Sequence, residues 1–74
     1  MPVVDVTAIG NRIHDIADAA GFTAKDFADA CCLTNRNAVY KWFKGTCMPT
    51  IDNFIIIAHM LGTTIDNLLV VRNA

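Results

Sequence analysis

Side chains that can bind a polyanion are concentrated in one short segment, NRNAVYKWFKG, near the middle of the chain. Asn37, Tyr40, Lys41 and Lys44 recur there at helical spacing, and Arg36 lies beside Tyr40 on the same side. Arginine can form two hydrogen bonds with a guanine edge, and asparagine can do the same with adenine. The spacing therefore predicts a helix with one face able to contact nucleic acid.

Each of these residues also has a simpler explanation. Arg36 and Asn37 can be ordinary polar residues of a capping turn, and capping alone would explain Asn35. Lys41 and Lys44 can be part of a solvated helix face. Tyr40 can reach a phosphate or a thymine methyl group, and Lys41 a phosphate or guanine. We predict that the base-reading residues are Asn35, Arg36, Asn37, Tyr40 and Lys41, and that Lys44 contacts phosphate.

Four further residues flank this segment with groups suited to phosphate. Thr23 and Thr50 each precede a predicted helix, whose free backbone amides can bind an anion. Lys25 follows the first of these starts, and Thr46 lies in the loop before the second. Plain capping explains both helix-starting threonines, and capping does not exclude a phosphate contact. All four are predicted phosphate contacts.

The charges are unevenly distributed along the chain of 74 residues, whose formal net charge is -1. Residues 30–51 contain three cations and no acid, whereas the remainder contains three cations and all seven acids. The local balance of +3 against -4 matters more than the total, because local potential steers a polyanion to a surface. The length suits one domain, which we predict to span residues 1–74 with a core at about 5–70.

The positions of apolar residues predict five short helices and no strand. The expected ranges are 6–20, 24–30, 35–44, 51–61 and a fifth helix starting at Thr64, with connections of about two to five residues. Asp5, Thr23 and Thr50 are the expected N-caps, and Gly21, Gly45 and Gly62 end their helices. The expected core residues are Ile9, Ile13, Ile16, Ala17, Ala20, Phe27, Ala28, Cys31, Ala38, Val39, Trp42, Phe43, Ile51, Phe54, Ile57, Ala58, Leu61, Ile65, Leu68 and Leu69.

Other classes of function find little support in the residues. Cys31, Cys32 and Cys47 have no metal-ligand spacing, and we interpret them as free thiols in a reducing cytoplasm, with a regulatory thiol as the alternative. His14 and His59 have no matched partners. Serine and glutamate are absent, and we expect no pocket, no catalytic residues, no metal, no cofactor and no small-molecule substrate. No apolar run is long enough for a membrane span, and no secretory signal is expected.

Taken together, these segments resemble the Cro/repressor-like (Xre-type) helix-turn-helix family. The segments that carry the resemblance, in order, are IGNRI, AGFTAKDFA, AVYKWFKG, MPTIDNF and LGTTIDNLL, between residues 9 and 69. The resemblance implies an all-α, compact bundle of five helices of the lambda-repressor-like type, with the second and third helices as the helix-turn-helix. It also implies a cytoplasmic bacterial or phage regulator that binds double-stranded DNA in a sequence-specific manner, with the third helix in the major groove.

Several positions depart from the family pattern. The turn between the second and third helices is one residue longer, as in a branch with a Y-K-W core. Cys32 replaces a frequent left-handed glycine, so we predict different backbone angles there. Ala24 replaces a DNA-contacting glutamine. Ala17 and Phe43 match the positions of an arginine–glutamate ion pair, and we predict an apolar contact between them.

Two hypotheses about partners remain open. Ile55, Ile56 and Met60 widen the apolar side of the fourth helix, which favours a homodimer through the fourth and fifth helices. A different hypothesis is a scaffold that binds another protein without DNA, favoured by the near-neutral charge, by Ala24 and by the apolar fourth helix.

Overall fold

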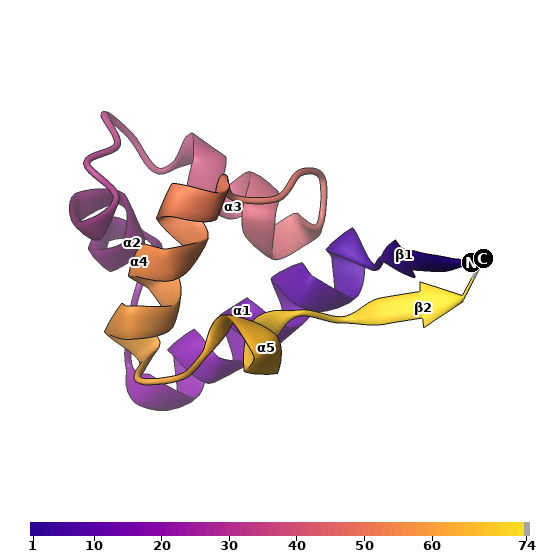
Figure 1. Ribbon diagram of the computed structural model, residues 1–74. Helices are drawn as coiled ribbons and strands as arrows, with labels where there is room; N and C mark the ends of the chain where they lie inside the picture. Colours follow the sequence, from indigo (N-terminus) through magenta and orange to yellow (C-terminus); the bar gives the residue numbers. More distant parts are fainter. Residues whose placement is uncertain (74) are drawn as a thin grey trace.

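The computed structural model describes residues 1–73, which form five helices and a small two-stranded ribbon (Figure 1). The predicted bundle of five helices is confirmed, although the third helix begins later than expected. The connections 31–36 and 45–50 are also longer than predicted. The elements are β1 (Pro2–Val4), α1 (Val6–Ala20), α2 (Ala24–Ala30), α3 (Asn37–Lys44), α4 (Ile51–Leu61), α5 (Ile65–Leu68) and β2 (Val71–Asn73).

Helices α1, α2 and α4 begin at the capping side chains that the sequence predicts. Asp5 accepts a hydrogen bond from the amide of Ala8 at the start of α1, at 3.0 Å. Thr23 and Asp26 form a reciprocal capping box at the start of α2. Such caps satisfy amides that have no partner within the helix and contribute about 1 kcal/mol each. Thr50 and Thr64 cap α4 and α5 in the same way.

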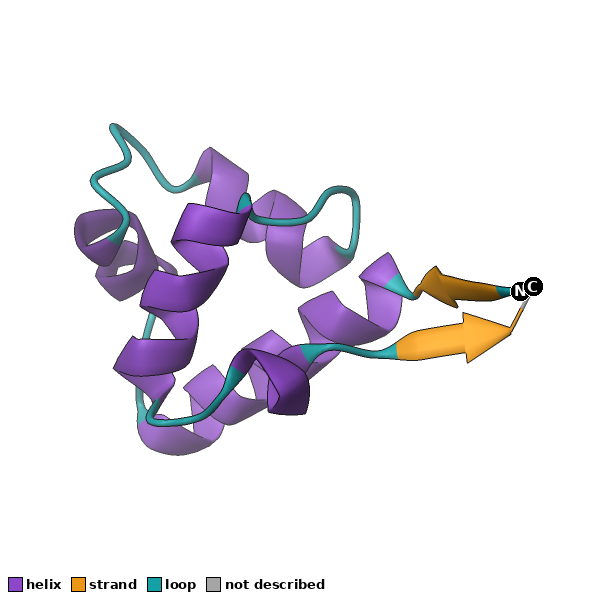
Figure 2. Ribbon diagram, in the orientation of Figure 1, coloured by secondary structure: helices purple, strands orange, loops and turns teal. Residues whose placement is uncertain are grey.

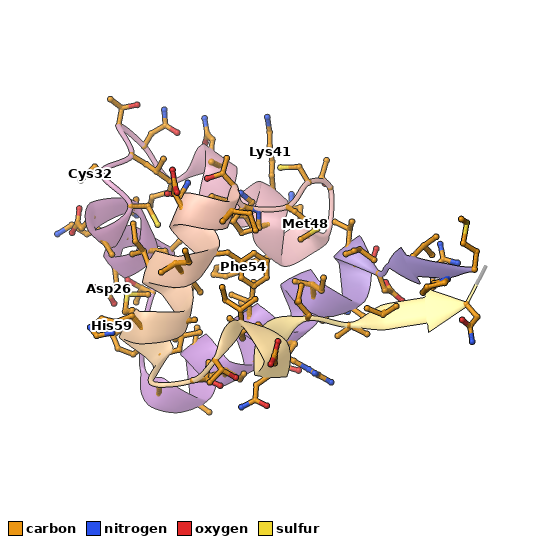
Figure 3. All side chains as sticks on the ribbon, viewed as in Figure 1. Asp26, Cys32, Lys41, Met48, Phe54 and His59 are labelled. Carbon is orange, nitrogen blue, oxygen red and sulfur yellow. The ribbon has the colours of Figure 1, made fainter. Side chains whose placement is uncertain are left out.

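The core lies where α1, α2, α3 and α4 meet and is closed by α5. Phe27 and Phe54 are its largest fully buried side chains, and Phe54 points into the middle of the bundle (Figure 3). Burying a side chain of this size stabilises the fold by about 1.5–3 kcal/mol. Leu68, which is fully buried, ties the short α5 to the same core. The core thereby fixes α3 against the other helices.

Two residues of the predicted core lie at the surface. Ile51 is 70% exposed and Ala20 is exposed, so both predictions are wrong. Each occupies an end of its helix, Ile51 the start of α4 and Ala20 the end of α1. Helical spacing assigns a face but not the length over which neighbouring elements cover that face, and these two ends are uncovered.

The two ends of the described chain pair as an antiparallel ribbon that projects from the helical body (Figure 2). Val3 pairs with Arg72 in this register. The Asp5 amide donates to the Val70 carbonyl at 2.8 Å, and Arg72 Nε lies 4.0 Å from Asp5 Oδ2. The expectation that no segment forms a strand is therefore wrong. Strands of three residues are too short to show alternation in the sequence.

Candidate functional site

The turn between α2 and α3 begins with a Schellman motif, the hydrogen-bonded closure found at many helix ends. The Leu33 amide donates to the Ala28 carbonyl at 2.8 Å, and the Cys32 amide donates to the Asp29 carbonyl at 3.3 Å. Cys32 has a φ of 57°, in the left-handed region that this motif requires. The prediction of other angles at Cys32 is therefore wrong, because the turn keeps the left-handed closure.

The rest of the turn lies just before α3. The Asn35 side chain accepts a hydrogen bond from the Asn37 amide at 2.9 Å, which agrees with a capping role. Arg36 is the N-cap residue of α3, yet its side chain makes no capping bond. Helix α3 thus begins at Asn37, two residues later than predicted. Asn37 lies in its first turn, whereas Asn35 and Arg36 lie in the turn that leads into it.

Helix α3 has two faces, as its sequence predicts. Val39 and Trp42 are buried in the core. Tyr40 is 46% exposed on the other side, and Lys41 extends away from the body of the molecule (Figure 3). The exposed residues Asn37 and Lys44 share that outer side at helical spacing. The structure therefore brings the predicted polar face together and leaves it open to solvent.

Close packing on α1 sets the position of α3. A Cβ atom on Gly10 would lie 2.1 Å from the carbonyl oxygen of Trp42. A Cβ atom on Gly45, at the end of α3, would lie 2.5 Å from the Cα atom of Thr7. Any side chain at either position would push the two helices apart. Gly10 is a positioning residue for the candidate site that hydrophobic spacing alone does not reveal.

The cations of this region have no carboxylate partners. Within the part of the chain that the structure describes, the only ion pair joins Arg72 to Asp5. Arg36, Lys41 and Lys44 are exposed and are therefore available to an external anion. The charges of these three side chains face water rather than an internal acid. A polyanion could therefore bind them without breaking an ion pair within the chain.

The predicted phosphate contacts outside α3 differ in their hydrogen bonds and surroundings. Thr23 Oγ1 accepts from the Asp26 amide at 3.4 Å, while the Asp26 carboxylate accepts from the Thr23 amide at 2.8 Å. The Asp26 carboxylate therefore places a negative charge at the end of α2 that would meet a phosphate. The exposed side chain of Lys25, the preceding residue, carries the opposite charge. Thr50 Oγ1 accepts from the Asn53 amide at 3.4 Å. Thr46 is exposed in the loop after α3.

The space behind α3 is lined by aromatic rings. The Phe43 ring lies 4.8 Å from the His14 ring and 5.4 Å from the Phe27 ring, measured between centroids. Phe43 is half-buried against the core cluster that contains Ala17. An apolar environment thus occupies the region of the expected contact, and the direct contact between Ala17 and Phe43 stays a prediction.

The remaining candidate residues separate into buried and exposed groups. Ile55 is 51% exposed, whereas Ile56 and Met60 are partly buried against the chain's own core. Burial raises the pKa of the Cys31 thiol, and the neighbouring Cys32 raises it further, while Cys32 and Cys47 are exposed. Among residues 1–73, no three His, Cys, Asp or Glu side chains gather as metal ligands, and no helix is long and apolar enough to cross a bilayer.

Comparison with known proteins agrees with this geometry. A family model described as helix-turn-helix (HTH_3) matches residues 13–68. No curated protein matches the sequence significantly. Among solved structures, the chain is similar to the restriction-modification controller protein C.AhdI from Aeromonas hydrophila, with a TM-score of 0.76 and 22% identity over 86% of this chain and 96% of that one. It is also similar to the clp gene regulator ClgR from C. glutamicum, with a TM-score of 0.72 and 16% identity over 84% and 79% of the two chains.

Proposed function

The chain belongs to the helix-turn-helix family (HTH_3), and from that premise we propose that it is a transcriptional regulator that binds specific sequences in double-stranded DNA. One observation carries the proposal: Arg36, Lys41 and Lys44 are exposed within the motif and have no carboxylate partner among residues 1–73. The names of the two similar structures, a controller and a gene regulator, support the regulatory part. No catalytic step or cofactor belongs to this function.

Helix α3 enters the major groove with its polar face toward the bases. Arg36 and Asn37, at the start of the helix, read base edges, and Tyr40 and Lys41 lie one turn further along. Asn35 is a weaker candidate, because its side-chain oxygen already accepts from the Asn37 amide. Lys44 reaches the backbone phosphates from the end of the same helix.

Phosphate contacts flank the groove. We assign them to Thr23 and Lys25 at the start of α2, and to Thr46 and Thr50 on the other side. The Asp26 carboxylate in the capping box opposes a phosphate at α2, so Lys25 must offset its charge. With few cations in the contact surface, one copy of the chain binds DNA modestly and with a strong dependence on salt.

We infer from the long turn and from Tyr40, Lys41 and Trp42 that the chain belongs to a branch of Xre-type proteins with a Y-K-W core in α3. Residues 34–36 separate the Schellman closure from the first residue of α3. The extra length moves Arg36 out of the helix and into the turn. Arg36 then approaches the DNA from the turn, while Asn37 approaches it from the helix.

A two-fold dimer would double the number of contacts. Helix α4 exposes Ile51 and Ile55, one helical turn apart, by 70% and 51%. This pair is a better candidate for a dimer surface than Ile56 and Met60, which pack against the core. The same exposed pair favours the rival function, a helix-turn-helix scaffold that binds another protein without DNA.

Fluorescence anisotropy with a labelled random DNA duplex pool separates the two functions. We expect binding that weakens steeply between low and moderate salt, because each phosphate contact releases counterions. Arg36→Ala and Lys41→Ala should each weaken binding and reduce the salt slope, and together they should abolish it.

Arg72→Ala is the matched control, since Arg72 is an exposed cation on β2, remote from α3. Its affinity should stay close to that of the unmodified protein. Equal losses from Arg72→Ala and Lys41→Ala would contradict a specific role of α3. No salt-sensitive binding at any protein concentration would favour the scaffold function instead.

A further inference from the structure

A surface cavity of about 350 Å³ opens between α1, the start of α2 and α3, although the sequence predicts no pocket. It is bounded by the rings of Phe22 and Phe43 and by five polar side chains, those of His14, Asp18, Thr23, Tyr40 and Lys44. The volume falls at the small end of the range for ligand sites, about 300–1,000 Å³. The cavity therefore suits a metabolite rather than a peptide.

Apart from Thr23, whose hydroxyl is bonded to Asp26, the polar groups around the cavity have no hydrogen-bond or ion-pair partner within residues 1–73. Within residues 1–73, the side chains of Asp18, Tyr40 and Lys44 make no hydrogen bond and no ion pair. The His14 ring lies 4.8 Å from the Phe43 ring, measured between centroids, and its side chain makes no hydrogen bond or ion pair within residues 1–73. A site thus presents one carboxylate, one ammonium group, an imidazole and a phenol around an apolar surface.

We propose that this cavity binds a small zwitterion with an aromatic or bulky apolar side chain, the chemistry of a free amino acid. Its ammonium group pairs with the Asp18 carboxylate, and its carboxylate pairs with the Lys44 ammonium group. The side chain lies against Phe22 and Phe43, where ring contacts add to apolar burial. The presence of both charges distinguishes this site from one for a simple anion, which Asp18 would repel.

Occupation of the cavity has a consequence for DNA, which rests on the proposed function. Lys44 lines the cavity and is also a proposed phosphate contact, and Thr23 lines the same cavity. A ligand carboxylate bound to Lys44 removes that cation from the DNA surface. The zwitterion therefore weakens binding of DNA, as an effector would.

The binding step is tested without DNA, so that its failure and a failure of the proposed function are distinguishable. L-phenylalanine is titrated into the isotope-labelled protein, and amide chemical shifts are followed by NMR. We expect saturable shifts around residues 14–24 and 40–44. Three analogues each lack one part: 2-phenylethylamine lacks the carboxylate, 3-phenylpropionate lacks the ammonium group, and glycine lacks the ring. Each should bind about tenfold more weakly, or worse.

Variants give the second part of the test. Asp18→Asn should lower the affinity for L-phenylalanine to that of 3-phenylpropionate, while Asp15→Asn, an exposed acid on the same helix outside the cavity, should leave it unchanged. Lys44→Met should lower the affinity for L-phenylalanine to the affinity that the unmodified protein has for 2-phenylethylamine. The proposal is overturned if no probe saturates, if the analogues bind as well as L-phenylalanine, if both aspartate variants behave alike, or if inorganic phosphate alone reproduces the shifts.

Discussion

At the scale of single residues, Cys32 is the clearest conflict between local preference and structure. Its φ of 57° is the only positive φ of a non-glycine residue among residues 1–73. Helices α1, α3 and α4 use Gly21, Gly45 and Gly62 at the same position. A side chain in the left-handed region costs about 1–2 kcal/mol, so the turn before α3 is locally strained.

Cys32→Gly should therefore stabilise the protein. Relief of the left-handed strain exceeds the extra entropy that glycine gains in the unfolded chain, and we expect about 0.5–1 kcal/mol. Urea denaturation followed by circular dichroism measures the change. Cys47→Gly is the matched control, because Cys47 is equally a free exposed thiol but has no positive φ. Cys47→Gly should lower the free energy of unfolding slightly. A similar decrease from Cys32→Gly would contradict the strain argument.

The three thiols should differ in reactivity. Because burial raises the pKa of Cys31, iodoacetamide should modify Cys31 more slowly than Cys32 or Cys47 at mildly alkaline pH, as measured by mass spectrometry of peptides.

The raised pKa of Cys31 also makes the free energy of unfolding depend on pH. Below the ordinary thiol pKa, Cys31 is protonated in both the folded and the unfolded protein, so its titration does not change the free energy of unfolding. Above that pKa the thiol ionises first in the unfolded protein, so the free energy of unfolding falls as pH rises. Equal modification rates would contradict the burial of Cys31.

At the scale of elements, the contact between α1 and α3 determines how the polar face is presented. Gly10 lies in the middle of α1 and is buried against the backbone of α3. Glycine inside a helix lowers its stability by about 1 kcal/mol relative to alanine, so the position favours alanine on local grounds alone. The close approach of the Trp42 carbonyl reverses that preference.

Gly10→Ala should destabilise the protein by about 3 kcal/mol or more, because the new methyl group meets a backbone oxygen that cannot rotate away. Thermal unfolding by circular dichroism measures the loss, and DNA affinity should fall with it as α3 is displaced. Gly21→Ala is the comparison, because nothing lies within 4 Å of the added Cβ atom. Only the left-handed backbone at position 21 should then lower the free energy of unfolding, by about 1–2 kcal/mol. A smaller loss at Gly10 than at Gly21 would show that the helices separate easily.

At the scale of the whole molecule, the ribbon is an appendage to the helical body rather than part of its core. Val4 and Val71 are 46% and 58% exposed, and every residue of β2 is exposed. Isolated two-stranded ribbons are marginally stable in water. The main attachments are the Asp5–Val70 hydrogen bond and the solvent-exposed ion pair of Arg72.

Removal of the residues after Val70 should lower the free energy of unfolding by about 1 kcal/mol or less, since exposed pairs of this kind contribute little. Denaturation should remain a single cooperative transition with an unchanged helical signal. Hydrogen exchange on the full chain is an independent check: β1 and β2 amides should exchange faster than those of α1 and α4. Protection of the ribbon equal to that of α1 would mean that it unfolds with the core.

Local chemistry accounts for most of what could be predicted. Capping residues such as Thr23 and Thr50 bond to amides three residues away, so they mark helix starts whatever surrounds them. The two faces of α3 follow from the spacing of Trp42 and Lys41 on one helix. The five helices, their caps and a solvent-facing cationic surface are in this sense consequences of near neighbours in the chain.

Contacts between distant segments decided the rest. Whether Ile51 is covered depends on where other helices end, and the ribbon depends on bringing the two ends of the chain together. The need for glycine at position 10 and the cavity beside Lys44 likewise arise only when α1, α2 and α3 pack. Spacing along one helix cannot encode such relations, because their energy comes from atoms that the chain brings together only on folding.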